Sequence, residues 1–208
     1  MMKENKSKII ISSIIVLLPV LFGLIMWDAL PDTMATHWGS NGNVDRYSGK
    51  AFVVFGLPVI LLIGHLIGLF FTFRDKRQKD QTKKALGMIF WIIPFISLLI
   101  NGMIYGIGFG KEVNVQMMIP TMLGILFIFL GNYMPKIKQN STLGIKISWT
   151  LNNEENWNKT HRFAGKVWVL GGFAMVFSMF MPDLAIIAML ACIIIPIIYS
   201  YSIYKKHQ

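Results

Sequence analysis

Six apolar segments of about the length that crosses a lipid bilayer dominate this sequence. Roughly 20 residues of helix span the hydrocarbon core, and a chain that is 54% hydrophobic and 14% charged has too little polar surface for a soluble domain. The sequence therefore predicts an all-α, polytopic membrane protein with six transmembrane helices. The predicted spans are residues 9–27, 51–73, 85–109, 113–134, 167–181 and 184–204.

The fifth span is the shortest, and it reaches full length only if its helix begins earlier, within residues 150–163. Asn152, followed three residues later by Glu155, is typical of a helix start, and acidic residues there suit the helix dipole. Aromatic and small residues then recur at helical spacing on one face: Trp157, His161, Ala164 and Trp168. This pattern predicts a helix that lies partly at the membrane interface.

Basic residues are divided unevenly among the segments that join the spans. Seventeen of the 20 lysines and arginines lie before the first span, between the second and third, between the fourth and fifth, or after the last. Because cytoplasmic segments carry the excess of Lys and Arg, both termini are predicted to be cytoplasmic (N-in/C-in). The net charge of +10 then reflects topology and contact with anionic lipid, and no direct nucleic-acid binding is expected.

This topology gives a single membrane domain, residues 1–208, with three polar segments. Residues 28–50 are predicted to form an extracellular loop, 74–84 a cytoplasmic basic loop and 135–166 a larger cytoplasmic segment. None reaches the ~40 residues below which an unaided core usually fails. The outer segment contains residues that favour turns: Gly39, Asn41, Gly42 and Asn43.

Residue patterns that carry catalysis are sparse in this chain. Its one cysteine, Cys192, allows neither an internal disulfide nor a cysteine-based zinc site. The sequence has no H-E-x-x-H motif, no G-x-S-x-G motif and no pair of intramembrane aspartates. We therefore expect a protein that is not an enzyme and that needs no cofactor.

His65 is the ionisable side chain nearest the middle of a predicted span, where such groups are costly and often functional. A proton relay would need further Asp, Glu or His residues at the same depth, and none is present. We expect a neutral imidazole bonded to a neighbouring helix, for example to Asn101. Glycines at four-residue spacing are also predicted to let helices approach closely: Gly64, Gly68, Gly102, Gly106 and Gly110.

One possible metal site lies in the outer segment. Asp32, His37 and Asp45 could ligate a divalent ion through one imidazole and two carboxylates. The alternative is that His37 and Trp38 pack on the outer ends of the helices. We favour the alternative, so no metal site is predicted.

Two motif blocks resemble known bacterial families. Residues 30–50, with the pattern LP-x-x-M-A-x-H-W-x-x-x-G-x-x-D-R-Y-x-x-K, resemble the extracellular loop of a membrane-protein domain of unknown function, DUF1648. Residues 131–165 are similar to the signature of the SdpI family: N-x-M-P-K-x-K-x-N, then G-I, W-T-L and W-x-x-T-H-R-x-x-G. The residues that match this second signature are Asn132, Met134, Pro135, Lys136, Lys138, Asn140, Gly144, Ile145, Trp149, Thr150, Leu151, Trp157, Thr160, His161, Arg162 and Gly165.

The chain departs from the family patterns in two places. Met34 and Ala35 stand where a proline often follows the LP pair, and Ser148 stands where proline or another small residue is frequent. Neither departure affects the most specific positions of the two blocks.

The resemblance implies a non-enzymatic, multi-pass protein of the bacterial cell membrane with an immunity function. Such a protein protects the producing bacterium from a secreted peptide toxin. The resemblance also implies signalling, in which the protein holds a cognate transcriptional repressor at the inner face of the membrane. The alternative is a transporter or exporter of a small substrate, which would move a solute across liposome membranes.

These roles assign candidate residues to the two sides of the membrane. Exposed aromatic and Arg side chains are frequent binding hot spots, and the residues expected to sense the toxin are His37, Trp38, Asp45, Arg46 and Tyr47. Those expected to dock the repressor are Lys136, Lys138, Trp149, Trp157, His161 and Arg162. A purely structural role for the cytoplasmic motif is the alternative, with Pro135 and Gly144 shaping the loop and Arg162 bonding to backbone carbonyls.

Overall fold

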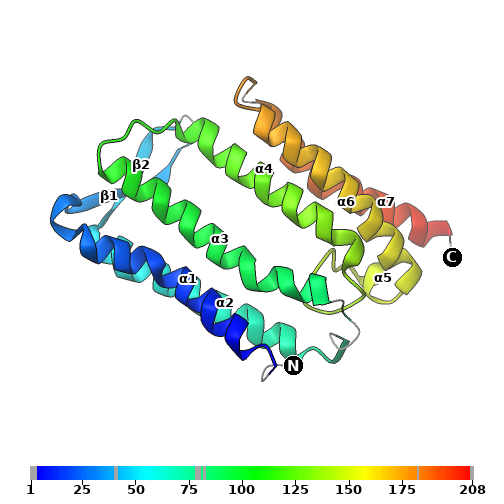
Figure 1. Cartoon of the computed structure of the whole chain (residues 1–208). Coiled ribbons are helices and arrows are strands. Elements are labelled where there is room, and N and C mark those ends of the chain that lie inside the picture. Colours follow the sequence, from blue (N-terminus) through cyan, green and yellow to red (C-terminus); the bar gives the residue numbers. More distant parts are fainter. Residues whose placement is uncertain (1–3, 40–41, 78–80, 82, 182, 207–208) are drawn as a thin grey trace. The chain divides into compact units, whose positions relative to one another are not determined.

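The computed structural model describes residues 4–39, 42–77, 81, 83–181 and 183–206 (Figure 1). Helices account for most of these residues, as the sequence predicts. Contacts along the chain divide it into two compact units, Met1–Phe73 with Gly87–Gln116, and Arg74–Leu86 with Met117–Gln208. The prediction of a single membrane domain stays a prediction.

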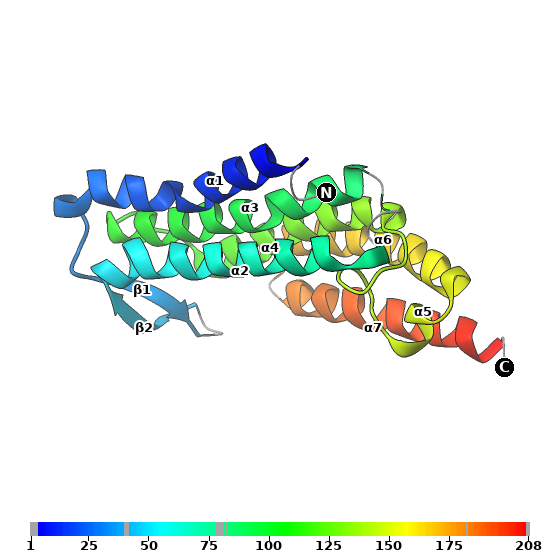
Figure 2. The same ribbon diagram turned by 90° about the horizontal axis from the view of Figure 1, so that it is seen from below.

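The first unit consists of three long helices and a β-hairpin. Helix α1 is Lys6–Ile25, α2 is Leu57–Arg74, and α3 is Lys83–Gly108, most of which lies in this unit. A short 3₁₀ turn, Trp27–Ala29, follows α1, and one π-helical stretch, Phe52–Gly56, leads into α2. The three helices lie side by side (Figures 1 and 2).

Buried polar groups fix how the helices of the first unit pack. In α3 the Ser97 hydroxyl donates to the Val16 carbonyl at 2.9 Å, and the Tyr105 hydroxyl donates to the Pro19 carbonyl at 2.9 Å. Both acceptors are on α1, so α1 and α3 run in the same direction. Buried side chains near the hairpin form a hydrophobic core in the first unit: Leu30, Met34, Val53, Val54, Ile104 and Tyr105.

His65 is buried in α2, as expected, but its partner is not Asn101. The Nε2 atom of His65 lies 2.8 Å from the Ser12 hydroxyl of α1. The prediction named the wrong helix because a sequence gives the depth of a side chain in the membrane and not its direction around the helix axis. The interaction has the form of a structural hydrogen bond between two helices.

The second unit contains the remaining helices and the motif loop. Helix α4 is Val115–Tyr133, a 3₁₀ turn covers Met134–Lys136, α5 is Ser148–Leu151, α6 is Glu154–Phe177 and α7 is Asp183–Lys206. Helices α6 and α7 pack along their length. The Trp168 indole N–H donates to the Cys192 carbonyl at 2.8 Å, and the Asn156 amide donates to the Ser200 carbonyl at 3.0 Å.

Close helix approach occurs at other glycines than the sequence predicted. A Cβ added to Gly64, Gly68, Gly102 or Gly106 would meet nothing within 4 Å. By contrast, a Cβ on Gly131 would lie 2.8 Å from the Gly165 carbonyl oxygen. A second pair of glycines makes equally close contacts, each seven residues from the first pair on its helix: Gly124 on α4 and Gly172 on α6. The backbones of helices α4 and α6 are therefore in direct contact. The four-residue spacing of glycines within one helix did not indicate this contact.

Five helices of the described chain are long and apolar enough to cross a membrane: Lys6–Ile25, Phe52–Arg74, Ala85–Gly108, Val115–Lys136 and Asp183–Lys206. Together with the relationship reported below, they make this a multi-pass cell membrane protein. The remaining predicted span, the fifth (residues 167–181), overlaps the C-terminal part of α6, whose N-terminal part is polar. The count of six spans and the N-in/C-in orientation stay predictions.

The start of α6 lies within the range expected from the sequence, but the capping residue is different. The Asn153 side chain accepts a hydrogen bond from the Asn156 backbone N–H at 2.8 Å. The predicted pair, Asn152 and Glu155, is one residue out of register with this cap. The two acidic residues in the first turn are Glu154 and Glu155, as suits the helix dipole.

Candidate functional sites on the hairpin and the motif loop

The segment predicted as an extracellular loop contains an antiparallel β-hairpin that the sequence reasoning missed. Strand β1 is Thr33–Trp38 and β2 is Val44–Gly49, with register irregularities on either side of His37. Gly42 has a φ of +78° in the connection, which agrees with the predicted turn. Asn41, also predicted in a turn, lies outside the described residues.

Strand β1 anchors the hairpin in the first unit. Met34 and Ala35 are 2% and 5% exposed, and Met34 belongs to the buried cluster at the hairpin end of the unit. Lys50 closes the base of the hairpin, since its ammonium lies 3.2 Å from the Asp32 carboxylate and donates to the Trp27 carbonyl at 3.2 Å. The hairpin is therefore held as a fixed element.

The exposed surface of the hairpin presents four of the five residues predicted to sense a toxin. His37, Asp45 and Arg46 are exposed, and Tyr47 is 62% exposed. Trp38 is half-buried against the hydrophobic cluster of the first unit, so only part of its ring is available.

His37 and Asp45 form a pair on this surface. Their Nδ1 and Oδ1 atoms are 2.6 Å apart, and both side chains are more than half exposed. The Asp32 carboxylate is engaged by Lys50 instead. The described residues contain no group of three His, Cys, Asp or Glu side chains placed to hold a metal ion.

The motif loop between α4 and α6 is ordered by buried side chains. Asn140 is fully buried, and its Oδ1 accepts hydrogen bonds from the Thr142 and Leu143 backbone N–H groups at 2.8 and 2.7 Å. Its amide donates to the Lys138 carbonyl at 2.8 Å. The Thr150 hydroxyl donates to the Ile145 carbonyl at 2.7 Å. These polar groups take the place of regular backbone pairing in the loop.

Trp157 and His161 lie in the first turns of α6, where the helix packs against this loop. Their rings stack with centroids 4.0 Å apart, and the Trp157 indole N–H donates to the Ile137 carbonyl at 2.8 Å. The Ile145 backbone N–H donates to Nε2 of His161 at 3.0 Å, so the ring proton is on Nδ1, which donates to the Trp157 carbonyl at 2.8 Å. Burial lowers the pKa of His161 to about 4, although the bond to the Trp157 carbonyl opposes this shift.

Gly144 completes the arrangement around His161. Its φ is +102°, a conformation that residues with a Cβ rarely adopt. A Cβ at this position would also collide with Nε2 of His161. Gly144 of the G-I motif therefore lies directly against His161 of the T-H-R motif.

Two of the predicted repressor-docking residues are not on the surface. Trp157 and His161 are 0% and 1% exposed, so neither can contact a partner directly, and we correct the prediction for both. They were expected on the surface because they are polar or aromatic residues of the predicted cytoplasmic segment, whereas both lie in the first turns of α6. Their burial arises because each ring satisfies a loop carbonyl or N–H group that would otherwise be unpaired.

The other four predicted docking residues remain accessible. Lys138 and Arg162 are exposed, while Lys136 is half-buried over the Tyr133 ring at 4.7 Å. Trp149 is half-buried, and its indole N–H donates to the Ser200 hydroxyl at 2.9 Å. A hollow of about 290 Å³ lies beside it, lined by Ser148, Trp149, Asn152, Asn153 and Tyr204.

The basic segment after α2 contributes contacts to the motif loop that sequence reasoning missed. The Asp75 carboxylate accepts from the Ser141 backbone N–H at 2.7 Å. The Gln81 amide binds the Lys138 backbone on both sides, accepting from its N–H at 3.0 Å and donating to its carbonyl at 2.5 Å. The sequence signal for these contacts was the presence of Asp75 and Gln81 among six cationic residues. Lys79 of this segment lies outside the described residues.

Comparison with known proteins places both sites in recognised families. Residues 136–201 match the model of the SdpI/YfhL protein family, and residues 14–62 match that of the domain of unknown function DUF1648. The chain is 32% identical over 210 residues to a protein named immunity protein SdpI, from Bacillus subtilis (strain 168). The match covers 99% of this chain and 98% of that relative. No solved structure matches it. The chain belongs to the SdpI/YfhL protein family.

Proposed function

We propose that this protein is an immunity protein that protects the producing bacterium against a secreted peptide toxin. The observation that carries the proposal is the near-complete alignment, at 32% identity, with a protein named for immunity. The protection is non-enzymatic: the protein binds the toxin or shields its membrane target, and the toxin stays intact.

In this proposal the exposed surface of the hairpin meets the toxin. The surface combines a cation, Arg46, a large exposed aromatic ring, Tyr47, and the polar pair of His37 and Asp45. Arg and Tyr are enriched among the residues that dominate binding energies. The buried residues of β1 keep these groups in place before the partner arrives, which lowers the entropy lost on binding.

Expression of this chain in a toxin-sensitive bacterium tests the immunity role. Cells that carry the gene are challenged with peptides secreted by the source strain, beside cells with an empty vector. Protected growth, with the peptide recovered uncleaved, supports the proposal. Equal killing of both strains contradicts it, and a modified peptide indicates an enzyme instead. Transport of a solute into liposomes by the purified protein would favour the transporter alternative.

We also propose that the accessible part of the motif loop holds a cytoplasmic transcriptional repressor when toxin is bound. Lys138 and Arg162 supply exposed positive charge, and the hollow beside Trp149 offers a polar and aromatic recess. A protein partner with acidic side chains and one inserted apolar group fits such a surface.

The Arg162→Ala variant tests this second role. Arg162 is exposed, so its loss leaves stability within about 0.5 kcal/mol. Recruitment of a fluorescently tagged repressor to the membrane should fall at least severalfold, while the Lys159→Ala variant, which changes an exposed cation on the same helix, should recruit normally. Unchanged recruitment in Arg162→Ala and in a Lys138→Ala, Arg162→Ala double variant would exclude this surface.

A further inference from the structure

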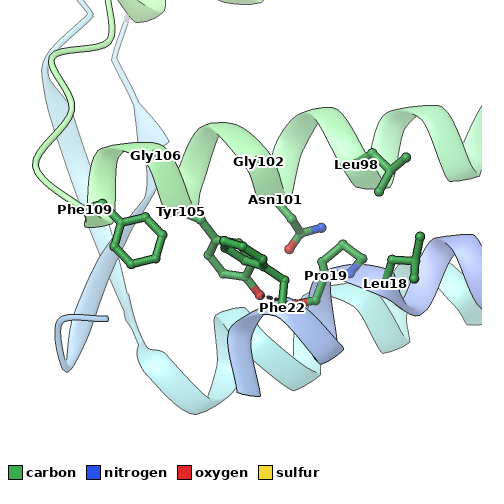
Figure 3. A pocket seen from close by; sticks show the side chains of 9 residues that line it. All are labelled: Leu18, Pro19, Phe22, Leu98, Asn101, Gly102, Tyr105, Gly106 and Phe109. Carbon is green, nitrogen blue, oxygen red and sulfur yellow. Dashed lines mark hydrogen bonds between the residues drawn. The ribbon is translucent and has the colours of Figure 1, made fainter. Parts of the chain in front are cut away.

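A groove of about 420 Å³ lies along α1 and α3 within the first unit (Figure 3). The two helices are both long and apolar enough to cross a membrane. Three apolar side chains of the lining, Leu18, Phe22 and Leu98, are 41–46% exposed, so the groove opens on the apolar surface of the helices. Its volume lies in the range of small-molecule pockets, about 300–1,000 Å³.

The lining contains a buried hydrogen-bond acceptor that has no partner. Asn101 is 0% exposed, and its amide nitrogen donates to the Ser97 carbonyl at 2.8 Å. Its Oδ1 atom accepts no hydrogen bond within the described part of the chain. An acceptor left unpaired in an apolar medium is costly, and natural structures rarely keep one without a reason.

The second polar side chain in the groove is also an acceptor. The Tyr105 hydroxyl already donates to the Pro19 carbonyl at 2.9 Å, as the dashed line in Figure 3 shows. Its oxygen can therefore only accept a further bond. The nine lining residues include no charged side chain. A carboxylate or phosphate finds no donor in this groove, whereas an uncharged O–H or N–H group finds acceptors.

We propose that this groove binds an uncharged, single-chain amphiphile whose head group donates an O–H or N–H hydrogen bond to Oδ1 of Asn101. The hydrocarbon chain lies against the apolar lining, where it replaces lipid contacts. Because Asn101 has no exposed surface, the proposal requires a side chain of the lining to move aside before the donor reaches Oδ1. This binding is independent of the proposed immunity function, since it uses neither the hairpin nor the motif loop.

A pair of matched probes tests the hydrogen-bond requirement. Photoreactive analogues of hexadecanol and of methyl hexadecanoate have the same chain, but only the alcohol can donate. The full-length protein is labelled with each in phosphatidylcholine vesicles, and labelled peptides from residues 98–109 are quantified. One neutral hydrogen bond corresponds to about a two- to tenfold preference for the alcohol. Equal labelling by both probes in the native protein overturns the proposal.

Variants of the lining residues then test whether the preference for the alcohol arises in the groove. Asn101→Leu removes the acceptor at similar volume, and the ratio of alcohol to ester labelling should fall to about one. Gly102→Leu fills the groove and should reduce labelling by both probes severalfold. A side chain at Gly102 meets nothing within 4 Å, so this variant introduces no clash at its Cβ. Gly64→Leu, at an equally open glycine outside the groove, should leave labelling unchanged.

Each result decides the matter. An unchanged ratio in Asn101→Leu, or unchanged labelling in Gly102→Leu, contradicts the proposal. If Asn101→Leu fails to insert, the ratio measured in the native protein and the Gly102→Leu result still decide it. Mass spectrometry of lipids that copurify with the native protein then distinguishes a resident membrane amphiphile from an added one.

Discussion

The hairpin and the motif loop are both polar segments of an apolar chain, yet they are held in different ways. The hairpin is fixed by backbone pairing and by the burial of Met34 and Ala35 in β1, which leaves His37, Asp45, Arg46 and Tyr47 exposed. The motif loop has little regular structure and is fixed by buried polar side chains. A polar residue in the hairpin is therefore available to a partner, whereas many polar residues in the motif loop maintain the fold.

This difference predicts the largest stability effect at Gly144. Gly144→Ala places a Cβ at a φ of +102° and against the His161 ring. Strained backbone and a lost buried hydrogen bond together should destabilise the loop by about 2–4 kcal/mol. The measurement is the rate of trypsin cleavage in the loop, where Lys146 is exposed, with the protein in liposomes.

The control for this prediction is Gly87→Ala. A side chain there meets nothing within 4 Å, and alanine favours the helix. Cleavage of the loop should be unchanged in this variant. Equal cleavage rates in the native protein and in Gly144→Ala would mean that the loop does not depend on the contact with His161.

A second effect, of comparable size, is expected from pH. The pKa of His161 is lowered to about 4 in the folded loop, from an ordinary value of 6.5. The unfolded loop binds a proton first as the pH falls, so stability is constant above pH 6.5 and declines between pH 6.5 and 4. The full loss is about 3 kcal/mol at 1.36 kcal/mol for each pKa unit.

The His161→Gln variant isolates this effect. Glutamine does not titrate, so loop cleavage by a protease active in acid should rise between pH 6.5 and 4 in the native protein and vary much less in the variant. Parallel pH profiles would show that another group controls the acid sensitivity of the loop.

The same comparison explains what could be predicted from the sequence. Spanning helices follow from apolar length, and five of the predicted spans agree with the helices to within three residues at each end. The start of α6 follows from local capping chemistry, and its cap was predicted to within one residue. The partner of His65 and the glycines between α4 and α6 depend on how helices are rotated against each other. Composition and spacing within one segment do not determine that rotation.

The candidate sites were predictable to different degrees for a related reason. Four of the predicted hairpin residues are exposed because polar side chains of an anchored segment stay in solvent, and their role in binding stays a prediction. Trp157 and His161 were expected on the surface, but both are buried because they bond to a carbonyl and an N–H group of residues 20 and 16 positions away along the chain. A polar side chain is found in a core when irregular backbone there requires a partner.

The smallest effect on stability, and a large effect on function, is predicted at Asp45. Asp45→Ala removes an exposed carboxylate paired with His37, so the free energy of unfolding should change by less than about 1 kcal/mol. If the hairpin surface binds the toxin, losing a hot-spot residue costs at least about 1–2 kcal/mol of binding, or roughly 5- to 30-fold in affinity. The toxin concentration that halves growth should fall by a similar factor, whereas Asp28→Ala, which changes an acidic residue of the turn before the hairpin, should protect normally. Full resistance in both Asp45→Ala and Trp38→Ala would show that the hairpin does not bind the toxin. The hairpin and the motif loop would then differ in how they are folded and not in how they bind partners.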